Sequence, residues 1–139
     1  MVYKRKAHVL FVGSGDAGRA IMATVFANAL GQGFMQARAV GLSDATWPPE
    51  LLRVMQEVGF DAANQPLHTL SSDHLAWADL LVTLDQAAAD ACPTLPPQVQ
   101  MRCYPFAQPA NIDALRQVRD AIQQRVAGMV GGMAMLANV

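Results

Sequence analysis

The ten residues FVGSGDAGRA, at positions 11–20, have the composition of a loop that binds phosphate or arsenate. An apolar run leads into small residues, and an arginine follows where a helix is predicted to begin. In such a turn, backbone N–H groups converge on an anion, the helix amino end adds partial positive charge, and the arginine binds two oxygens. The predicted anion-binding residues are therefore Gly13, Ser14, Gly15, Asp16, Ala17, Gly18 and Arg19.

The chemistry of this loop is limited by its side chains. A glycine-rich turn before a helix is a weak signal, because a purely structural turn has the same composition. Ser14 carries a hydroxyl, but no general base is evident beside it, and an unassisted hydroxyl attacks poorly at neutral pH. Asp16 leaves two interpretations open. Either it accepts loop N–H bonds or pairs with Arg19 in place of an anion, or it points outward as a helix cap.

The elements that must position this loop alternate between buried strands and amphipathic helices. Apolar runs predict strands at residues 8–12, 35–41, 79–84 and 99–104, whereas the polar residues 61–72 are expected to be irregular. Apolar spacing predicts helices at residues 18–30, 48–58 and 112–129, a helical turn at 73–76 and a short helix ending near Cys92. This order predicts an α/β fold of three layers, with a four-stranded parallel sheet flanked by helices.

The length and composition predict one domain over residues 1–139, with residues 128–139 as a loose end or, alternatively, a self-association surface. Apolar residues make up 53% of the chain, and the net charge is −1. No basic surface suited to nucleic acid is apparent, and no apolar run approaches the roughly 20 residues of a membrane span. We therefore expect a cytoplasmic protein without nucleic-acid or membrane partners. A protein partner and a homodimer remain open.

The cysteines and histidines do not form a metal-binding pattern. Cys92 and Cys103 are too few for a disulfide framework or a metal knuckle, and both are expected to be thiols. Cys103 is expected to be buried in the last strand. His68 and His74 lie six residues apart without a third ligand in sight. We therefore predict no metal and no cofactor.

From residue 8 to about residue 129 the chain resembles the low-molecular-weight protein tyrosine phosphatase superfamily, and most closely its thioredoxin-linked arsenate reductases. Five stretches in family order and spacing carry the resemblance: VLFVGSGDAGRAIMA, PELLRVMQEVGFD, ADLLVTLDQAAADACP, PPQVQMRCYPFAQPA and QVRDAIQQRV. The resemblance implies the phosphatase-like α/β fold and a loop that binds phosphate, sulfate or arsenate.

The resemblance also implies catalytic residues, and this chain departs from them. Gly13 stands where the family has its nucleophilic cysteine, five residues before the retained Arg19. Gln108 precedes a proline where family phosphatases have an aspartate as general acid. Of two relay cysteines in the reductases, Asp85 stands at the first position and Cys92 at the second. One thiol cannot close the internal disulfide.

Two hypotheses about function follow. The coordinated losses favour a pseudo-enzyme that binds a protein partner or a small anion, since removal of a covalent nucleophile has cost roughly a million-fold in rate where it was measured. The rival is a surviving enzyme, either a slow phosphatase or arsenate reductase, or one with new chemistry. That new chemistry would use Ser14, Asp85 or Cys92, the one candidate for a redox thiol.

Overall fold

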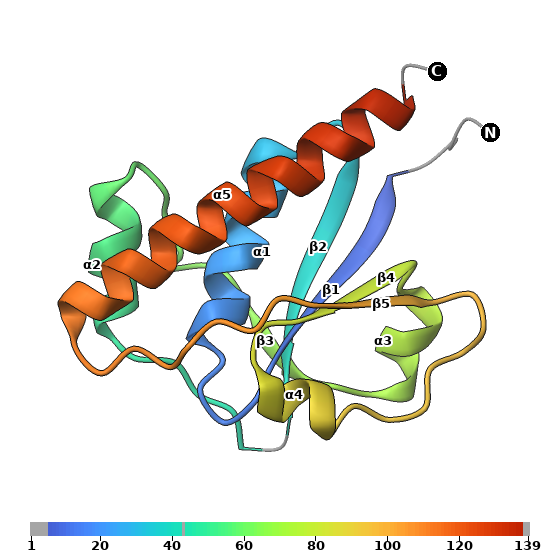
Figure 1. Ribbon diagram of the computed structural model, residues 1–139, viewed down its shortest axis with the longest axis horizontal. Helices are drawn as coiled ribbons and strands as arrows, with labels where there is room; N and C mark the ends of the chain where they lie inside the picture. The colour runs from blue at the N-terminus through green and yellow to red at the C-terminus, as the bar shows by residue number, and fades with distance from the viewer. Residues whose placement is uncertain (1–5, 43, 138–139) are drawn as a thin grey trace.

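The computed structural model describes residues 6–42 and 44–137 and shows a parallel sheet between two layers of helices (Figure 1). The strands are β1 (Ala7–Gly13), β2 (Met35–Gly41), β3 (Leu67–Thr69), β4 (Leu80–Thr83) and β5 (Gln100–Cys103). The helices are α1 (Gly18–Leu30), α2 (Glu50–Glu57), α3 (Ser72–Trp77), α4 (Gln86–Asp90) and α5 (Ile112–Ala137). The predicted three-layer α/β class is confirmed.

The sheet has five strands rather than the predicted four, in the order β3-β2-β1-β4-β5. The additional strand, β3, lies in the segment that was expected to be irregular. It pairs in parallel with β2, and the Leu70 N–H extends the pairing by donating to the Gly41 carbonyl at 2.9 Å. Because β3 is only three residues long and carries no buried side chain, no apolar run marks it in the sequence.

The strands are buried because each face of the sheet packs against its own helices. On one face, Val9 and Phe11 of β1 join a core with residues of α1, α2 and α5. On the other face, Leu10 and Val12 pack in a smaller cluster with residues next to α3 and α4. All four of these side chains are 0% exposed, which explains the uninterrupted apolar run that predicted β1.

The last helix is longer than predicted. The described part of α5 continues to Ala137, eight residues beyond the expected end, and Met129 and Val130 are buried against the core. Residues 128–137, for which a loose end or a self-association surface was left open, are therefore helical here, whereas residues 138–139 lie outside the described part. Within the described residues, no helix is long and apolar enough to cross a membrane.

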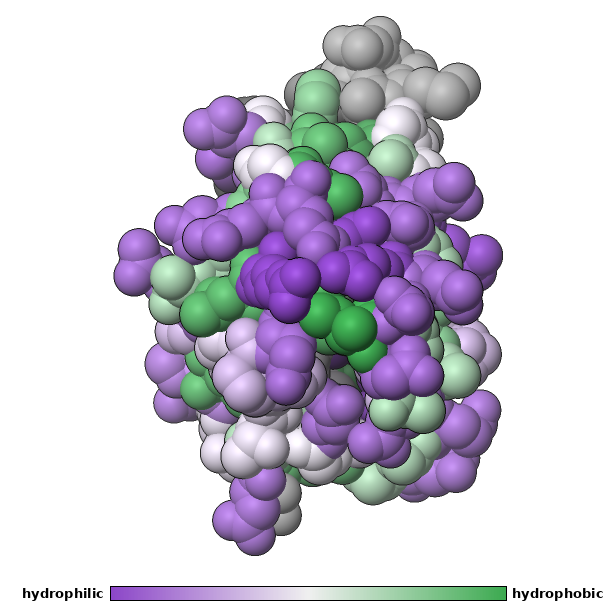
Figure 2. All heavy atoms as spheres, turned by 90° about the vertical axis from the view of Figure 1, so that its left-hand side faces the viewer, coloured by the Kyte–Doolittle hydropathy of each residue, from purple (hydrophilic) through white to green (hydrophobic). Residues whose placement is uncertain are grey.

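An ion-pair network fixes the start of α5 beside α2. The Glu57 carboxylate accepts hydrogen bonds from Arg116 at 2.8 Å and from Arg119 at 2.8 Å, and Arg119 also donates to the Val54 carbonyl. The hydrogen bond from Arg116 is the main reason that the pKa of Glu57 falls to about 2. Figure 2 views the molecule from this side, where hydrophilic side chains gather over α2 and the start of α5.

Candidate functional site

The predicted anion loop, residues 13–19, connects β1 to α1 at the carboxyl edge of the sheet, between the ends of β2 and β4. Its main chain is tied to the segment that follows β2. Leu42 N–H donates to the Gly13 carbonyl at 3.1 Å, and Thr46 N–H donates to the Gly15 carbonyl at 3.0 Å. In return, Ala17 N–H donates to the Thr46 carbonyl at 2.7 Å. The loop is therefore held from one side by backbone bonds.

A carboxylate of the protein itself, that of Asp85, lies against the loop. Asp85 lies two residues after the end of β4 and is the N-cap of α4, where its Oδ1 accepts the Ala88 N–H at 2.7 Å. Its Oδ2 accepts from Ser14 twice, from the backbone N–H at 3.2 Å and from the hydroxyl at 2.9 Å. The same oxygen lies 3.4 Å from Nη2 of Arg19, and both side chains are more than nine-tenths buried. Asp85 thus accepts two hydrogen bonds from Ser14 and faces Arg19 inside the loop.

Asp16 accepts a loop N–H bond, as the first of its two interpretations predicted, and this bond lies at the start of α1. Its Oδ1 accepts the N–H of Gly18, the first residue of α1, at 2.9 Å. The expected pairing of the Asp16 carboxylate with Arg19 is wrong, because Arg19 Nη2 lies 3.5 Å from the Asp16 backbone carbonyl instead. Arg19 Nη1 donates to the Phe106 carbonyl at 2.6 Å, so the charged partner of this arginine is Asp85.

Three backbone donors of the loop have partners within the protein. The N–H groups of Ser14, Ala17 and Gly18 bind Asp85, Thr46 and Asp16 respectively. One buried donor is left over, since Nε of Arg19 has no partner among the described residues. A carboxylate has only two oxygens, and one oxygen of Asp85 faces α4, so the other oxygen cannot satisfy every donor of the loop.

Gly13 is closed to any side chain in this loop conformation. A Cβ atom built on Gly13 would lie 2.8 Å from the Ala17 Cα and 3.1 Å from its Cβ. The closer of these contacts is with backbone, so the loop itself would have to shift to admit a larger residue. In this conformation the first position of the loop carries no side chain and has no room for one.

A cavity of about 380 Å³ lies beside the loop. Asp16 and Gln108 both belong to its lining. The walls are formed by the residues before α2 and by the turn that enters α5. The complete lining is Asp16, Pro48, Glu50, Gln108, Pro109, Ala110, Asn111, Ile112 and Leu115.

The chain matches the low molecular weight phosphotyrosine protein phosphatase family over residues 8–137. It belongs to this family. The arsenate reductase of Bacillus subtilis is 32% identical over 123 residues, which cover 88% of each chain. Arsenate reductase 1 of Staphylococcus haemolyticus is 31% identical over 123 residues, or 87% of this chain and 92% of that one.

Solved structures share the fold of this family member. A structure described as an arsenate reductase in the phosphate binding state superposes with a TM-score of 0.74 at 23% identity, covering 91% of this chain and 98% of the other. The thioredoxin-dependent arsenate reductase of Corynebacterium glutamicum gives a TM-score of 0.80 at 19% identity, covering 96% and 65% respectively. At these identities the likeness concerns the fold alone.

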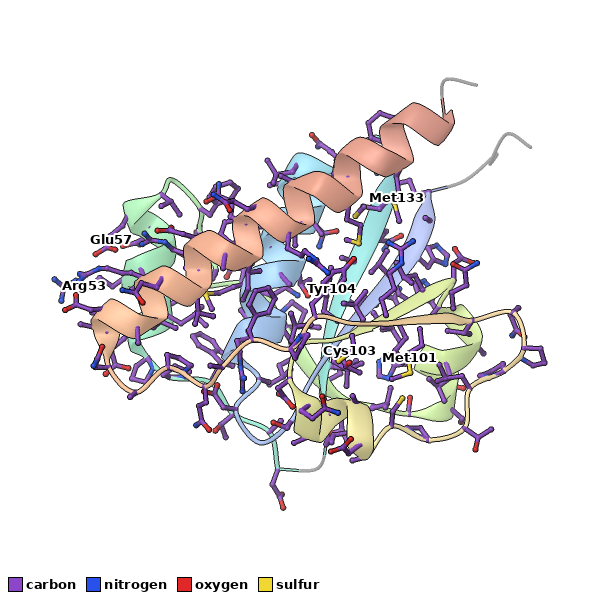
Figure 3. All side chains as sticks on the ribbon, in the orientation of Figure 1. Arg53, Glu57, Met101, Cys103, Tyr104 and Met133 are labelled. Carbon is purple, nitrogen blue, oxygen red and sulfur yellow. The ribbon has the colours of Figure 1, made fainter. Side chains whose placement is uncertain are left out.

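Neither cysteine of this family member belongs to the loop of residues 13–19. Cys92, the candidate redox thiol, is half-buried against the apolar cluster beside α4, and this burial raises its pKa. A raised pKa leaves less thiolate at neutral pH, which disfavours reactivity. The expectation of a buried Cys103 is wrong: Cys103 is exposed, because β5 is an edge strand with four exposed residues (Figure 3).

The histidine pair does not become a metal centre. The rings of His68 and His74 lie 6.0 Å apart, and within the described residues no three His, Cys, Asp or Glu side chains are grouped to hold a metal ion. His74 instead accepts the Ser71 N–H at 3.1 Å and helps to cap α3.

The contact between Asp85 and the loop was not predicted, although the position of Asp85 in the sequence indicated it. Asp85 was considered as a replaced relay residue and as a candidate for new chemistry, but not as a partner of the loop. It lies two residues after the end of β4, a buried strand adjacent to β1 in the sheet, so it had to lie at the same edge as the loop. The hydrogen bond from the Ala17 N–H to Thr46 could not be predicted in this way, because its acceptor is a backbone carbonyl, which every residue has.

Proposed function

We propose that this family member is a binding protein that has lost the covalent chemistry of an enzyme, with its anion loop held closed by Asp85. The observation that carries the proposal is the Asp85 carboxylate bound to Ser14 and Arg19 inside the loop. An external oxyanion must take the place of this carboxylate before it can use the same donors. The loop is therefore chiefly a structural element, and it can bind a ligand only after Asp85 is displaced.

The absence of a nucleophile supports the noncatalytic assignment. Gly13 offers no lone pair, and its surroundings leave no space for a cysteine side chain. The hydroxyl of Ser14 donates to Asp85, whose carboxylate is also paired with Arg19. The same carboxylate also accepts the backbone N–H groups of Ser14 and Ala88, so both of its oxygens are already engaged. Ser14 is thereby disfavoured as a substitute nucleophile.

The other catalytic roles are also unfilled. Gln108 lines the cavity where a general acid would act, but an amide does not donate a proton as an acid does, and such a role contributes typically 100-fold to 10,000-fold. With Asp85 committed to the loop, Cys92 has no partner thiol in the relay position that the resemblance implies. These losses are independent of the loss at Gly13.

Closure by Asp85 implies weak binding of phosphate, sulfate or arsenate. Breaking a buried ion pair costs about 3–5 kcal/mol, and each 1.4 kcal/mol is tenfold in affinity. An anion that displaces Asp85 would therefore lose roughly two to four orders of magnitude in affinity, less whatever it gains from Nε of Arg19. That unpartnered Nε favours a second candidate function, an anion receptor that opens when its ligand is abundant.

Two activity assays test the proposal. We expect hydrolysis of an aryl phosphate and thioredoxin-coupled reduction of arsenate to stay at the level of a buffer blank. Turnover well above the blank that is lost in an Arg19→Lys variant would contradict the proposal, because it would show that the loop still performs chemistry. Intact-mass measurement after incubation with phosphate or arsenate complements the assays, since a covalent adduct would equally refute a noncatalytic loop.

A further inference from the structure

We infer that the open edge of β5 pairs with an extended segment of a protein partner in which acidic and apolar residues alternate. The inference goes beyond the proposed function and does not depend on it, because this edge lies outside the loop of residues 13–19. The open edge consists of β5 (Gln100–Cys103) and of Tyr104, which follows it.

The backbone of β5 offers hydrogen-bonding groups to a further strand. β5 is the last strand of the sheet, and among the described residues it pairs with β4 alone. The N–H groups of Gln100 and Tyr104 donate at 3.0 and 2.9 Å to carbonyls of β4 and of the residue before it. Because successive residues of a strand alternate in direction, the N–H groups of Met101 and Cys103 point the other way. Neither group has a partner among the described residues.

The opposite edge of the sheet is less available to a further strand. β3 has only three residues, and beyond its pairing with β2 the edge of β2 is covered by a side chain of α1. Nδ2 of Asn28 donates to the Ala37 carbonyl at 3.0 Å, and Oδ1 of Asn28 accepts the Ala37 N–H at 2.8 Å. This amide takes the place of a neighbouring strand, which is one way in which proteins protect an edge. No described side chain protects β5 in this way, so strand addition is directed to β5.

The arginines on one side of β5 favour an acidic partner. Arg102 and Tyr104 lie on the same side of the strand, which faces α5. There the guanidinium of Arg125 lies over the Tyr104 ring, 4.3 Å from its centre (Figure 3). Arg102 and Arg125 are both exposed, and no described carboxylate is paired with either of them. Acidic side chains of an added strand would therefore meet two positive charges that are not already neutralised.

The other side of the strand is apolar. The paired register places Met101 and Cys103 beside β4 on the face where Leu81 belongs to the smaller apolar cluster. Met101 is 43% exposed, the largest exposed fraction of any large apolar side chain in the described part of the chain. Side chains directly opposite each other on paired strands lie about 5 Å apart and interact. The two sides of β5 therefore match a partner strand with apolar residues on one side and carboxylates on the other.

A second copy of this chain is the competing occupant, and the same arginines disfavour it. Antiparallel pairing of two β5 edges by two-fold symmetry keeps the corresponding faces of both sheets on one side. Arg102 and Arg125 of both molecules would then gather on that side. Like charges that face each other across paired strands are destabilising, whereas an acidic segment supplies the opposite charge.

The test uses the full chain and a matched set of five-residue peptides. Nuclear magnetic resonance titration with acetyl-VEVEV-amide would follow the backbone amides of Met101 and Cys103. Acetyl-VQVQV-amide removes the charge at nearly constant shape, and N-methylation of the central valine of the acidic peptide removes a backbone donor. We expect saturable shifts and slowed hydrogen exchange of both amides with the acidic peptide. Binding should be several-fold weaker for the glutamine peptide and at higher salt, and should be lost on N-methylation.

Three variants of the chain complete the test. Arg102→Gln should weaken binding of the acidic peptide about two- to fivefold, the effect of one exposed charge. Cys103→Pro removes an N–H group on the open side, a position that tolerates proline in an edge strand, and should weaken binding at least as much. Arg53→Gln is the control, because Arg53 is an exposed arginine of α2 that lies 4.0 Å from Glu57. If Cys103→Pro fails to fold, Arg102→Gln and the N-methylated peptide still carry the test.

Four results would overturn the inference: no saturable shift with the acidic peptide, equal binding of the glutamine peptide, full binding of the N-methylated peptide, or equal binding by the Arg102→Gln and Arg53→Gln variants. Shifts of the Met101 and Cys103 amides that depend on protein concentration alone, together with a dimer mass in light scattering, would also overturn it. That outcome would assign the open edge to a second copy of the chain.

Discussion

Replacement of Asp85 by asparagine should open the loop to external oxyanions while lowering the stability of the protein. The substitution keeps the size of the side chain and an Oδ1 atom that can still accept the Ala88 N–H, so the cap of α4 survives. It removes the charge that faces Arg19 and the acceptor that binds Ser14. The change is therefore confined to the contacts that close the loop.

The expected loss of stability follows from the burial of this ion pair. The side chains of Arg19 and Asp85 are 5% and 8% exposed, and removing one partner of a buried pair costs about 3–5 kcal/mol. For a domain of this size the melting temperature falls by roughly 3 °C per kcal/mol, so we expect a decrease on the order of 10 °C. Phosphate at about one hundred times its dissociation constant should raise the free energy of unfolding of the variant by about 2.7 kcal/mol.

Thermal unfolding in phosphate and in sodium chloride of equal ionic strength measures this recovery. The wild-type protein should show little difference between the two salts, because the loop is already occupied by Asp85. Ile122→Ala is the matched control: Ile122 is 0% exposed, its truncation costs about 2–5 kcal/mol, and it lies outside the loop. Equal phosphate responses of wild-type and Asp85→Asn proteins, or no response in either, would refute the role assigned to Asp85.

Three further predictions follow from local contacts. Gly13→Cys should not restore phosphatase or arsenate reductase turnover and should lower the melting temperature, because its Cβ would lie 2.8 Å from the Ala17 Cα; measurable turnover would show that the loop adapts. Burial, and then nearby histidine and arginine charges, lower the pKa of His74 below 6.5, so its contribution to stability is present above about pH 6.5 and is lost as the pH falls below that value. Urea unfolding should show this loss, and His74→Gln, which retains an acceptor for the helix cap, should remove it; an unchanged profile would contradict the assignment. The pKa of Glu57 is lowered to about 2 from 4.5, chiefly by Arg116, so its contribution is present above pH 4.5 and lost as the pH falls toward 2. Glu57→Gln should flatten the acid unfolding profile in that window, whereas an identical profile would argue against the ion pairs between α2 and α5.

Most of the fold could be predicted because its elements bury regular apolar patterns. The bounds predicted for α1 and β2 agree with the structure at both ends. The strand β3 could not be predicted in the same way, because backbone pairing with β2 creates it while its side chains remain largely exposed. The extra length of α5 was missed because its glycines are poor helix formers, and burial of Met129 and Val130 outweighs that local preference.

The site was predicted in outline but not in its internal bonding. The loop composition and its place after the first strand located it at the sheet edge. The identity of the internal carboxylate was not predicted, because Asp16 is local in sequence while Asp85 reaches Ser14 from 71 residues away. The exposure of Cys103 was also missed, because a sequence pattern does not reveal that a strand lies at the edge of a sheet.

The most direct test of the central claim is a crystal structure of the wild-type protein grown in phosphate. We predict that Oδ2 of Asp85 will lie within hydrogen-bond distance of the Ser14 N–H and hydroxyl, with no anion between Ser14 and Arg19. A phosphate ion bound by the loop N–H groups and Arg19, with Asp85 turned away, would contradict the claim that this protein closes its own anion site.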